Sequence, residues 1–385
     1  MHNDSPQTHE ATPRELPVVD LLLTCLATPS VTPDDGGLLE RIAAYLPDYE
    51  AIWRNEGGVK NLFLSRRFAP GPHLCFAGHV DVVPPGEGWR TPPFVPTIVD
   101  GMLYARGAQD MKSGVAAALN ALRQTETFAG TLSLLLTSDE EGEAEFGTRI
   151  LLEHLQSLGR LPDYCVVAEP TCEETFGDAI KIGRRGSING IIRIQGRQGH
   201  AAYPEKAINP VHQIAPRLAR LAGVDLDTGD DDFAPSKLVI TDIRGGMEVT
   251  NVTPNQLQIM FNVRNSTATT RDDVQRYVEE VLAGLEYTLT LTQNSFPFVT
   301  ARDSVLVRTL QASVEAVTGI QPALSTAGGT SDARFMGAHG IEVVEFGTRN
   351  DTIHAPNERV AIEEVEALER VFQVLIERIG HANDF

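Results

Sequence analysis

Two observations in the sequence predict an α/β fold, with a mixed, mostly parallel sheet flanked by helices and an inserted ferredoxin-like α+β domain. Apolar runs of strand length recur along the chain, each bounded by turn residues, which is typical of buried parallel strands. The middle of the chain follows the order strand, helix, strand, strand, helix, strand, which is the ferredoxin-like order. We therefore expect a first part of the sheet domain in residues 1–186, the inserted domain in residues 187–294 and a second part in residues 295–385.

Four apolar runs supply strands of the predicted sheet. They lie at residues 74–78, 131–136, 164–168 and 343–347. Residues 112–126 differ, because Val115, Leu119 and Leu122 recur there at helical spacing. Asp110 is therefore expected in the loop that leads into a helix.

The inserted domain is predicted from four strands and two helices. The strands lie at residues 188–196, 237–243, 257–263 and 287–292, and the helices at residues 208–221 and 270–285. The third strand alternates apolar and polar residues, as a half-buried strand does. The second helix places Val274, Val278 and Val281 on one face, with Thr269 or Thr270 available as its N-cap.

Composition narrows the class of protein. A chain of 385 residues exceeds the usual size of a single core, so two domains are expected. The net charge of −20 argues against nucleic-acid binding, and no apolar stretch approaches the length of a membrane span. The four cysteines form no CxxC pair, and residues 1–14 are polar without a signal-peptide pattern. A cytoplasmic protein with reduced thiols is the expectation.

Residues of metal-binding type stand in short polar turns, most of which directly follow an apolar run. Any one of them alone would more often be solvated or structural. Open α/β sheets, however, place their chemistry outside the carboxyl ends of the strands, so these turns are expected to meet. Together they predict a two-metal hydrolase site. In chain order the residues are His79, Asp81, Asp110, Glu140, Glu141, Glu169 and His354.

A metal pair that activates water for amide hydrolysis needs imidazole and carboxylate ligands, typically with one carboxylate shared between the ions. His79 and His354 supply the imidazoles, and Asp110 is the natural bridge. Successive side chains diverge, so one of Glu140 and Glu141 is expected to bind metal while the other acts as general base. An aspartate two residues after a ligand histidine, as Asp81 is here, can orient that histidine.

Three motifs resemble those of the M20 metallopeptidase and deacylase family. They are GHVDVVP at residues 78–84, ARGAQDMK at residues 105–112 and TSDEEG at residues 137–142. Later segments, above all GGTSD at residues 328–332, are similar to the branch of this family that acts on N-succinyl-LL-2,6-diaminopimelate. The resemblance covers nearly the whole chain from Leu21 onward. It implies a sheet domain of the zinc-hydrolase type and an inserted domain that dimerises.

The resemblance implies two Zn²⁺ ions per subunit, for which Co²⁺ can substitute. Glu140 would be the general base, and Asp81 would orient His79. The ligands implied for one ion are His79, Asp110 and Glu169, and those for the other are Asp110, Glu141 and His354.

The resemblance also implies a homodimer, because His200 would reach the active site from the inserted domain of the partner subunit and stabilise the oxyanion. Arg184 and Arg264 would each hold a substrate carboxylate through a bidentate fork. The further substrate contacts that it implies are Tyr203, Asn251, Gly329, Thr330 and Asn350.

Three alternatives remain open. An N-acetylornithine deacetylase, or another M20 amidohydrolase or peptidase, would use the same metals on another substrate. An aminopeptidase-like enzyme would hold a single tightly bound metal ion. A non-catalytic binding module is expected to lack part of the ligand set, whereas the set is complete in this sequence.

Overall fold

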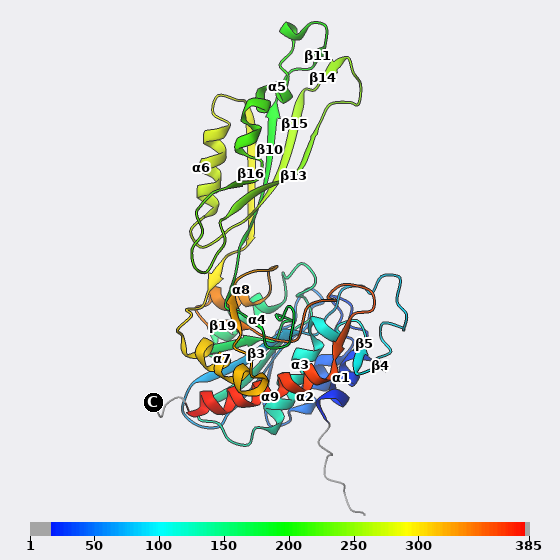
Figure 1. Ribbon diagram of the computed structural model, residues 1–385, viewed down its shortest axis with the longest axis vertical. Coiled ribbons are helices and arrows are strands. Elements are labelled where there is room, and N and C mark those ends of the chain that lie inside the picture. The colour runs from blue at the N-terminus through cyan, green and yellow to red at the C-terminus, as the bar shows by residue number, and fades with distance from the viewer. Residues whose placement is uncertain (1–16, 382–385) are drawn as a thin grey trace, which may run out of the picture.

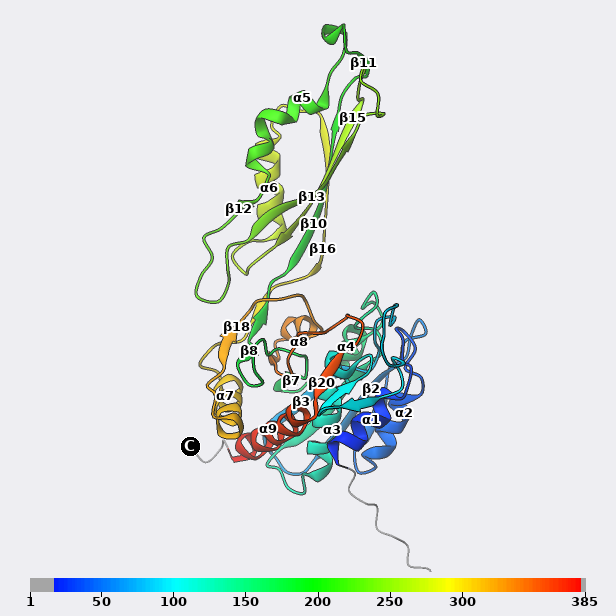
Figure 2. The same ribbon diagram turned by 45° about the vertical axis from the view of Figure 1, so that its right-hand side comes forward.

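A computed structural model describes residues 17–381 of the protein (Figure 1). The polar segment at residues 1–14 and the last residues of the third predicted part, 382–385, lie outside this range. Two units are stacked along the long axis of the molecule. Segments from both ends of the chain form the lower unit and the middle of the chain forms the upper one (Figure 1 and Figure 2).

An eight-stranded mixed sheet forms the centre of the lower unit. Its four central strands run parallel, in the order β6 (Thr131–Thr137), β3 (His73–His79), β7 (Tyr164–Val167) and β19 (Glu342–Glu345). One edge is extended by the antiparallel strands β2 (Asn61–Arg67) and β1 (Glu50–Trp53). The other edge is extended by β8 (Ala179–Lys181), antiparallel to β19, and by β18 (Ala323–Ser325), parallel to β8. The four predicted runs form the four parallel strands, so their carboxyl ends lie along one edge of the sheet.

Helices flank this sheet. One layer contains α1 (Val18–Leu26), α3 (Ser113–Gln124), α7 (Val305–Thr318) and α9 (Ile362–His381), each of which packs against another member. α2 (Leu38–Tyr45) contacts β2, while α4 (Thr148–Ser157) and α8 (Ala333–Ala338) contact each other below the upper unit (Figure 2). Within the described residues, none of the helices is both long enough and apolar enough to cross a membrane.

Two smaller sheets complete the lower unit. β4 (Thr97–Val99), β5 (Met102–Tyr104) and β20 (Arg359–Ala361) pair antiparallel, which joins the C-terminal segment to the loop before Asp110. β9 (Gly183–Arg184) pairs with β17 (Phe298–Val299), close to where the chain leaves and re-enters this unit.

The upper unit is an antiparallel sheet with helices on one face (Figure 2). Its strands, in spatial order, are β12 (Val224–Asp225), β13 (Lys237–Gly245), β15 (Gln256–Arg264), β10 (Ser187–Gln195) and β16 (Tyr287–Ser295). Without the two-residue edge strand β12, this is the ferredoxin-like arrangement that the sequence predicted. A ribbon of β11 (Gly199–His200) and β14 (Val252–Thr253) projects at the far end (Figure 1).

Of the two helices predicted for the inserted unit, the second is observed and the first is interrupted. α6 (Arg271–Val281) begins as expected at Thr270, whose side chain accepts a hydrogen bond from the Asp273 N–H in a capping box. The helix expected over residues 208–221 is wrong as a single element. Only Pro210–Ile214 is α-helical (α5), and Ala215–Arg220 continues as a 3₁₀ turn. Pro216 explains the break, because it lacks the N–H that an α-helical ladder requires.

Each unit has its own hydrophobic core. In the lower core Phe76 of β3 packs on Phe372 of α9, with ring centroids 4.8 Å apart. In the upper core Ile192 and Ile259 of the sheet pack with Val278 of α6. Fully burying an isoleucine, valine or phenylalanine side chain contributes about 1.5–3 kcal/mol to stability. The predicted fold class is confirmed.

Candidate metal centre

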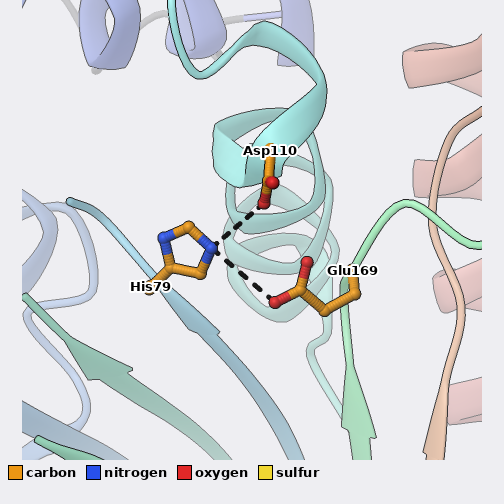
Figure 3. Close-up of side chains that lie close together, drawn as sticks. All are labelled: His79, Asp110 and Glu169. Atoms are coloured by element: carbon orange, nitrogen blue, oxygen red, sulfur yellow. Dashed lines mark hydrogen bonds and ion pairs between the residues drawn. The ribbon is translucent and has the colours of Figure 1, made fainter. Parts of the chain in front are cut away.

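His79, the last residue of β3, is buried with its ring orientation fixed. Its Nδ1 lies 2.9 Å from the main-chain oxygen of Asp81, which can only accept, so Nδ1 carries the proton. The lone pair of Nε2 is therefore free to bind a metal. Nε2 lies 3.2 Å from Asp110 Oδ1 and 3.6 Å from Glu169 Oε1, both of which point toward it (Figure 3).

Asp110 stands between two histidines. Its Oδ1 faces His79 Nε2, and its Oδ2 lies 3.2 Å from Nε2 of His354. His354 Nε2 also lies 3.0 Å from Glu141 Oε1. A carboxylate whose two oxygens face two separate imidazoles has the placement of a bridging ligand.

The predicted ligands thus gather into two groups that share Asp110. In each group the candidate donor atoms all lie within 4.8 Å of one another. One group is His79, Asp110 and Glu169, and the other is Asp110, Glu141 and His354. Imidazole nitrogen with carboxylate oxygen is a donor set that suits zinc.

Two glycines allow the backbone segments to approach closely at this point. A Cβ on Gly114, at the start of α3, would lie 2.1 Å from the carbonyl oxygen of Ala168. A Cβ on Gly347, just after β19, would lie 2.4 Å from the carbonyl oxygen of Glu169. Any larger residue at either position would push apart the segments that carry the ligands.

The buried carboxylates of the centre favour the binding of cations. Burial and the charge of Asp110 raise the pKa of Glu169 well above its usual range, although His79 opposes this. The pKa of His79 is also raised, because its hydrogen bond with Asp110 and the charges of Glu169 and Asp81 outweigh the effect of burial. Several carboxylates crowded into a buried space are stable together only with protons or metal ions between them.

Asp81 acts on more than His79. Its main-chain carbonyl orients the imidazole, whereas its carboxylate accepts hydrogen bonds from the N–H groups of Glu140, at 3.4 Å, and Glu141, at 3.1 Å. Asp81 is fully buried, and burial raises its pKa to about 6 despite the opposing charge of His79. The residue therefore links the histidine ligand to the turn that carries the two glutamates.

Glu140 lines the same cavity as four of the candidate ligands, Asp110, Glu141, Glu169 and His354, but belongs to neither ligand group. Burial, together with the charges of Asp332 and Asp110, raises its pKa to about 8, against the opposing charge of His79. A carboxylate with a raised pKa can take up a proton during a reaction and return it.

A cavity of about 550 Å³ opens over the metal centre. This is within the range typical of small-molecule sites. Of the predicted substrate contacts, Arg184, Gly329, Thr330 and Asn350 line it. Each nitrogen of Arg184 already has a partner: Nε lies 3.0 Å from both oxygens of Glu345, Nη2 also pairs with Glu345, and Nη1 donates to the Ala327 carbonyl.

The other predicted contacts do not line this cavity. Arg264 is exposed at the end of β15. His200, Tyr203 and Asn251 are exposed on or beside the β11–β14 ribbon, at the far end of the upper unit from the metal centre (Figure 1). Within one subunit the structure therefore does not bring His200 to the ligands.

Three residues that line the cavity or support its residues were not among the sequence predictions. Arg334 lines the cavity, and its Nε is buried without a hydrogen-bond partner among residues 17–381. Glu345 holds Arg184, and Glu358 accepts hydrogen bonds from the loop that carries Asp110. One signal was available: a glutamate within the apolar run at residues 343–347 has to find a partner when that run is buried.

Comparison with known proteins decides the family. The model of Peptidase family M20/M25/M40 matches residues 75–378. This chain is a member of the M20 family. The M20 chain is 61% identical to the succinyl-diaminopimelate desuccinylase of a Nitratiruptor species, across 93% of this chain and 99% of the relative. It is also 61% identical to the protein of the same name from a Sulfurovum species, across 93% and 98%.

Solved M20 structures share the fold at low sequence identity. The M20 family metallo-carboxypeptidase from Sulfolobus solfataricus superposes with a TM-score of 0.77 at 17% identity, covering 96% of this chain and 100% of that one. The YXEP protein of Bacillus subtilis, described as a dinuclear metal binding peptidase of this family, gives a TM-score of 0.69 at 16% identity, covering 94% and 97%. The family includes dinuclear metal-binding peptidases, and the two ligand groups of this chain agree with that.

Proposed function

We propose that this M20 chain hydrolyses N-succinyl-LL-2,6-diaminopimelate to succinate and LL-2,6-diaminopimelate, a step toward lysine. The observation that carries the proposal is its 61% identity, over nearly the full length of both chains, to relatives named succinyl-diaminopimelate desuccinylase. The complete set of metal-binding residues supports hydrolytic activity in this chain as well.

Two Zn²⁺ ions are proposed at the two ligand groups, with Co²⁺ able to substitute. His79 and Glu169 would hold one ion and Glu141 and His354 the other, with Asp110 shared between them. When bound, such ions lower the pKa of water and polarise the amide carbonyl.

In the proposed reaction Glu140 takes a proton from the attacking water. Its carboxylate lines the cavity beside the candidate ligands but belongs to neither ligand group, which leaves it available to accept and then return a proton. Glu140 then delivers this proton to the departing amine, so that succinate and the free amino group are released. Asp81 keeps Glu140 and Glu141 in place through their backbone N–H groups.

Substrate carboxylates are proposed to bind at the turn formed by residues 327–331. Thr330 and Asn350 offer hydrogen bonds, and Arg334 Nη1 lies 3.0 Å from Thr330 Oγ1. Arg334 is the better candidate for a direct charged contact than Arg184, because Arg184 already pairs with Glu345. Arg264 is proposed to contact substrate only if the upper unit moves toward the cavity.

A homodimer is proposed, with the inserted unit as its interface. His200 would stabilise the oxyanion in the partner's active site, and Tyr203 and Asn251 would contact substrate there. In support, these three residues are exposed at the end of the molecule that is far from their own metal centre. A reducing, cytoplasmic location is proposed because all four cysteines are buried and unpaired.

The test is a comparison of two substrates on the zinc-loaded protein. The proposal predicts that kcat/KM for N-succinyl-LL-2,6-diaminopimelate exceeds that for N-acetylornithine by about 10- to 100-fold, because an unpaired charged contact costs about 1.5–3 kcal/mol. A preference for N-acetylornithine would overturn the proposed substrate while leaving the two-metal site standing.

A further inference from the structure

Glu358 is a buried carboxylate that no role in the proposed reaction explains. It is 0% exposed and lies outside both ligand groups. Its Oε1 accepts hydrogen bonds from the N–H groups of Gln109, at 2.8 Å, and Asp110, at 3.1 Å. Its Oε2 accepts from the N–H of Gly107, at 3.0 Å. One carboxylate thus holds three backbone donors of the loop that ends in the shared ligand.

The same carboxylate also connects to the loop that carries His354. Arg106 is 2% exposed and donates from Nη1 to Glu358 Oε2 at 2.7 Å. Its other terminal nitrogen, Nη2, lies 3.3 Å from the main-chain oxygen of His354 and 3.2 Å from that of Pro85. Arg106 and Glu358 therefore form a buried link between the Asp110 loop and the His354 loop.

A second link joins the same two loops. Gln109, which is also buried, donates from Nε2 to Asp351 Oδ1 at 2.6 Å, and its Oε1 accepts from the N–H of Thr352 at 2.9 Å. Both links hold His354 in a backbone conformation with φ +59°, which a residue with a side chain rarely adopts.

We propose that Glu358 is a positioning residue, which sets the spacing of Asp110 and His354 and thereby the affinity of the Asp110–Glu141–His354 group for its metal ion. Buried residues behind metal ligands commonly change affinity by 10- to 100-fold when replaced. The other group shares Asp110 but depends less on this link, because its remaining ligands, His79 and Glu169, stand at or just after the ends of strands and not in the His354 loop. The inference rests on the proposed two-metal site, but not on the identity of the substrate.

The experiment measures Co²⁺ binding to the chelator-stripped full-length protein, with Co²⁺ alone as the probe. The wild-type chain is expected to bind two ions. Glu358→Gln places an amide NH₂ against backbone donors and should weaken the second ion by about 10- to 100-fold, with the first ion within about threefold. Glu369→Gln is the matched control. Glu369 accepts hydrogen bonds from Asn120, at 2.7 Å, and Gln124, at 3.0 Å, away from both loops, so both affinities should stay unchanged.

Arg106→Lys provides a second variant that retains a cation next to Glu358. A lysine has a single nitrogen and cannot reach both Glu358 and the His354 carbonyl, so the second ion should weaken by about three- to tenfold. His354→Ala removes a ligand of the second ion. In that background Glu358→Gln should change the affinity for the first ion by less than about threefold, because both substitutions act on the second ion.

The possible outcomes distinguish a failure of the role of Glu358 from a failure of the two-metal site. A wild-type chain that binds two Co²⁺ ions, with both affinities unchanged in Glu358→Gln and Arg106→Lys, would overturn the role of Glu358 and leave the proposed function intact. A wild-type chain that binds fewer than two ions would overturn the two-metal site, and this inference with it.

Discussion

Arg184 and Glu345 form a buried ion pair beside the metal centre. Glu345 is 0% exposed at the end of β19, and the guanidinium of Arg184 pairs with both of its oxygens. The pair also holds the turn at residues 327–331, because Arg184 Nη1 donates to the Ala327 carbonyl at 2.9 Å and Ser331 donates to Glu345. The same turn lines the cavity. The ion pair therefore supports part of the proposed substrate site from behind.

Breaking this ion pair should destabilise the protein and weaken substrate binding. Arg184→Met or Glu345→Gln alone leaves one buried charge without its partner, which typically costs about 3–5 kcal/mol. The double variant Arg184→Met/Glu345→Leu should regain more than half of the lost stability, but KM should stay raised because the turn has lost its two supports. Thermal unfolding and steady-state kinetics measure the two effects. Single variants with wild-type stability would rule out the ion pair as a structural element.

Arg334 should determine the preference for a charged acyl group. Arg334→Ala removes a cation that lines the cavity, so KM for the N-succinyl substrate should rise by about 10- to 100-fold. The KM for an N-acetyl substrate should change much less, because its acyl group has no carboxylate. Arg308→Ala, an exposed arginine on α7, is the control and should behave as wild type. An equal rise in KM for both substrates would contradict the assignment.

The proposed exchange of His200 between subunits can be tested by mixing two inactive variants. His200→Ala and Glu140→Ala should each lose activity as pure homodimers. In a mixed dimer, the site that keeps Glu140 receives an intact His200 from the partner, so random mixing should restore about a quarter of wild-type activity. The mixture should be unfolded and refolded together, and activity assayed against each variant refolded alone. No recovery, in a mixture shown to contain mixed dimers, would place His200 outside the partner's site.

His73 should make stability depend on pH. Burial lowers the pKa of His73 from 6.5 to about 4, although the charge of Asp163 opposes this. The unfolded chain therefore binds more protons than the folded one between about pH 4 and pH 6.5, so this contribution is complete above pH 6.5 and is lost as the pH falls. The shift corresponds to at most about 3 kcal/mol. His73→Gln should show a smaller drop in unfolding temperature than wild type between pH 7.5 and pH 5, and an equal drop would contradict it.

That the candidate metal ligands lie together could be predicted from the sequence, because each follows an apolar run or opens a helix, and parallel strands bring such positions to one edge. The placement of Asp110 needed only the helical spacing of Val115 and Leu119 after it. The supporting residues could not be found in this way. Glu358 and Asp110 lie 248 positions apart and meet through backbone N–H groups, which leave no pattern in side-chain chemistry.

The interruption of the predicted helix at Pro216 shows a second limit of prediction from the sequence. The apolar spacing over residues 208–221 was compatible with a helix, but the missing N–H of one proline outweighed it. Arg184 shows a third limit. Its motif suggested a substrate contact, which stays a prediction, but the motif did not reveal Glu345, the buried partner that the fold supplies.

The most direct test of a two-metal desuccinylase is the activity of the chelator-stripped protein as Zn²⁺ is added back, with N-succinyl-LL-2,6-diaminopimelate as substrate. Activity should be absent without metal and should reach its plateau at about two Zn²⁺ per chain. Glu140→Ala should bind the same amount of zinc and remain inactive throughout the titration. Full activity in the stripped protein, a plateau at one ion, or normal turnover by Glu140→Ala would contradict the proposed mechanism.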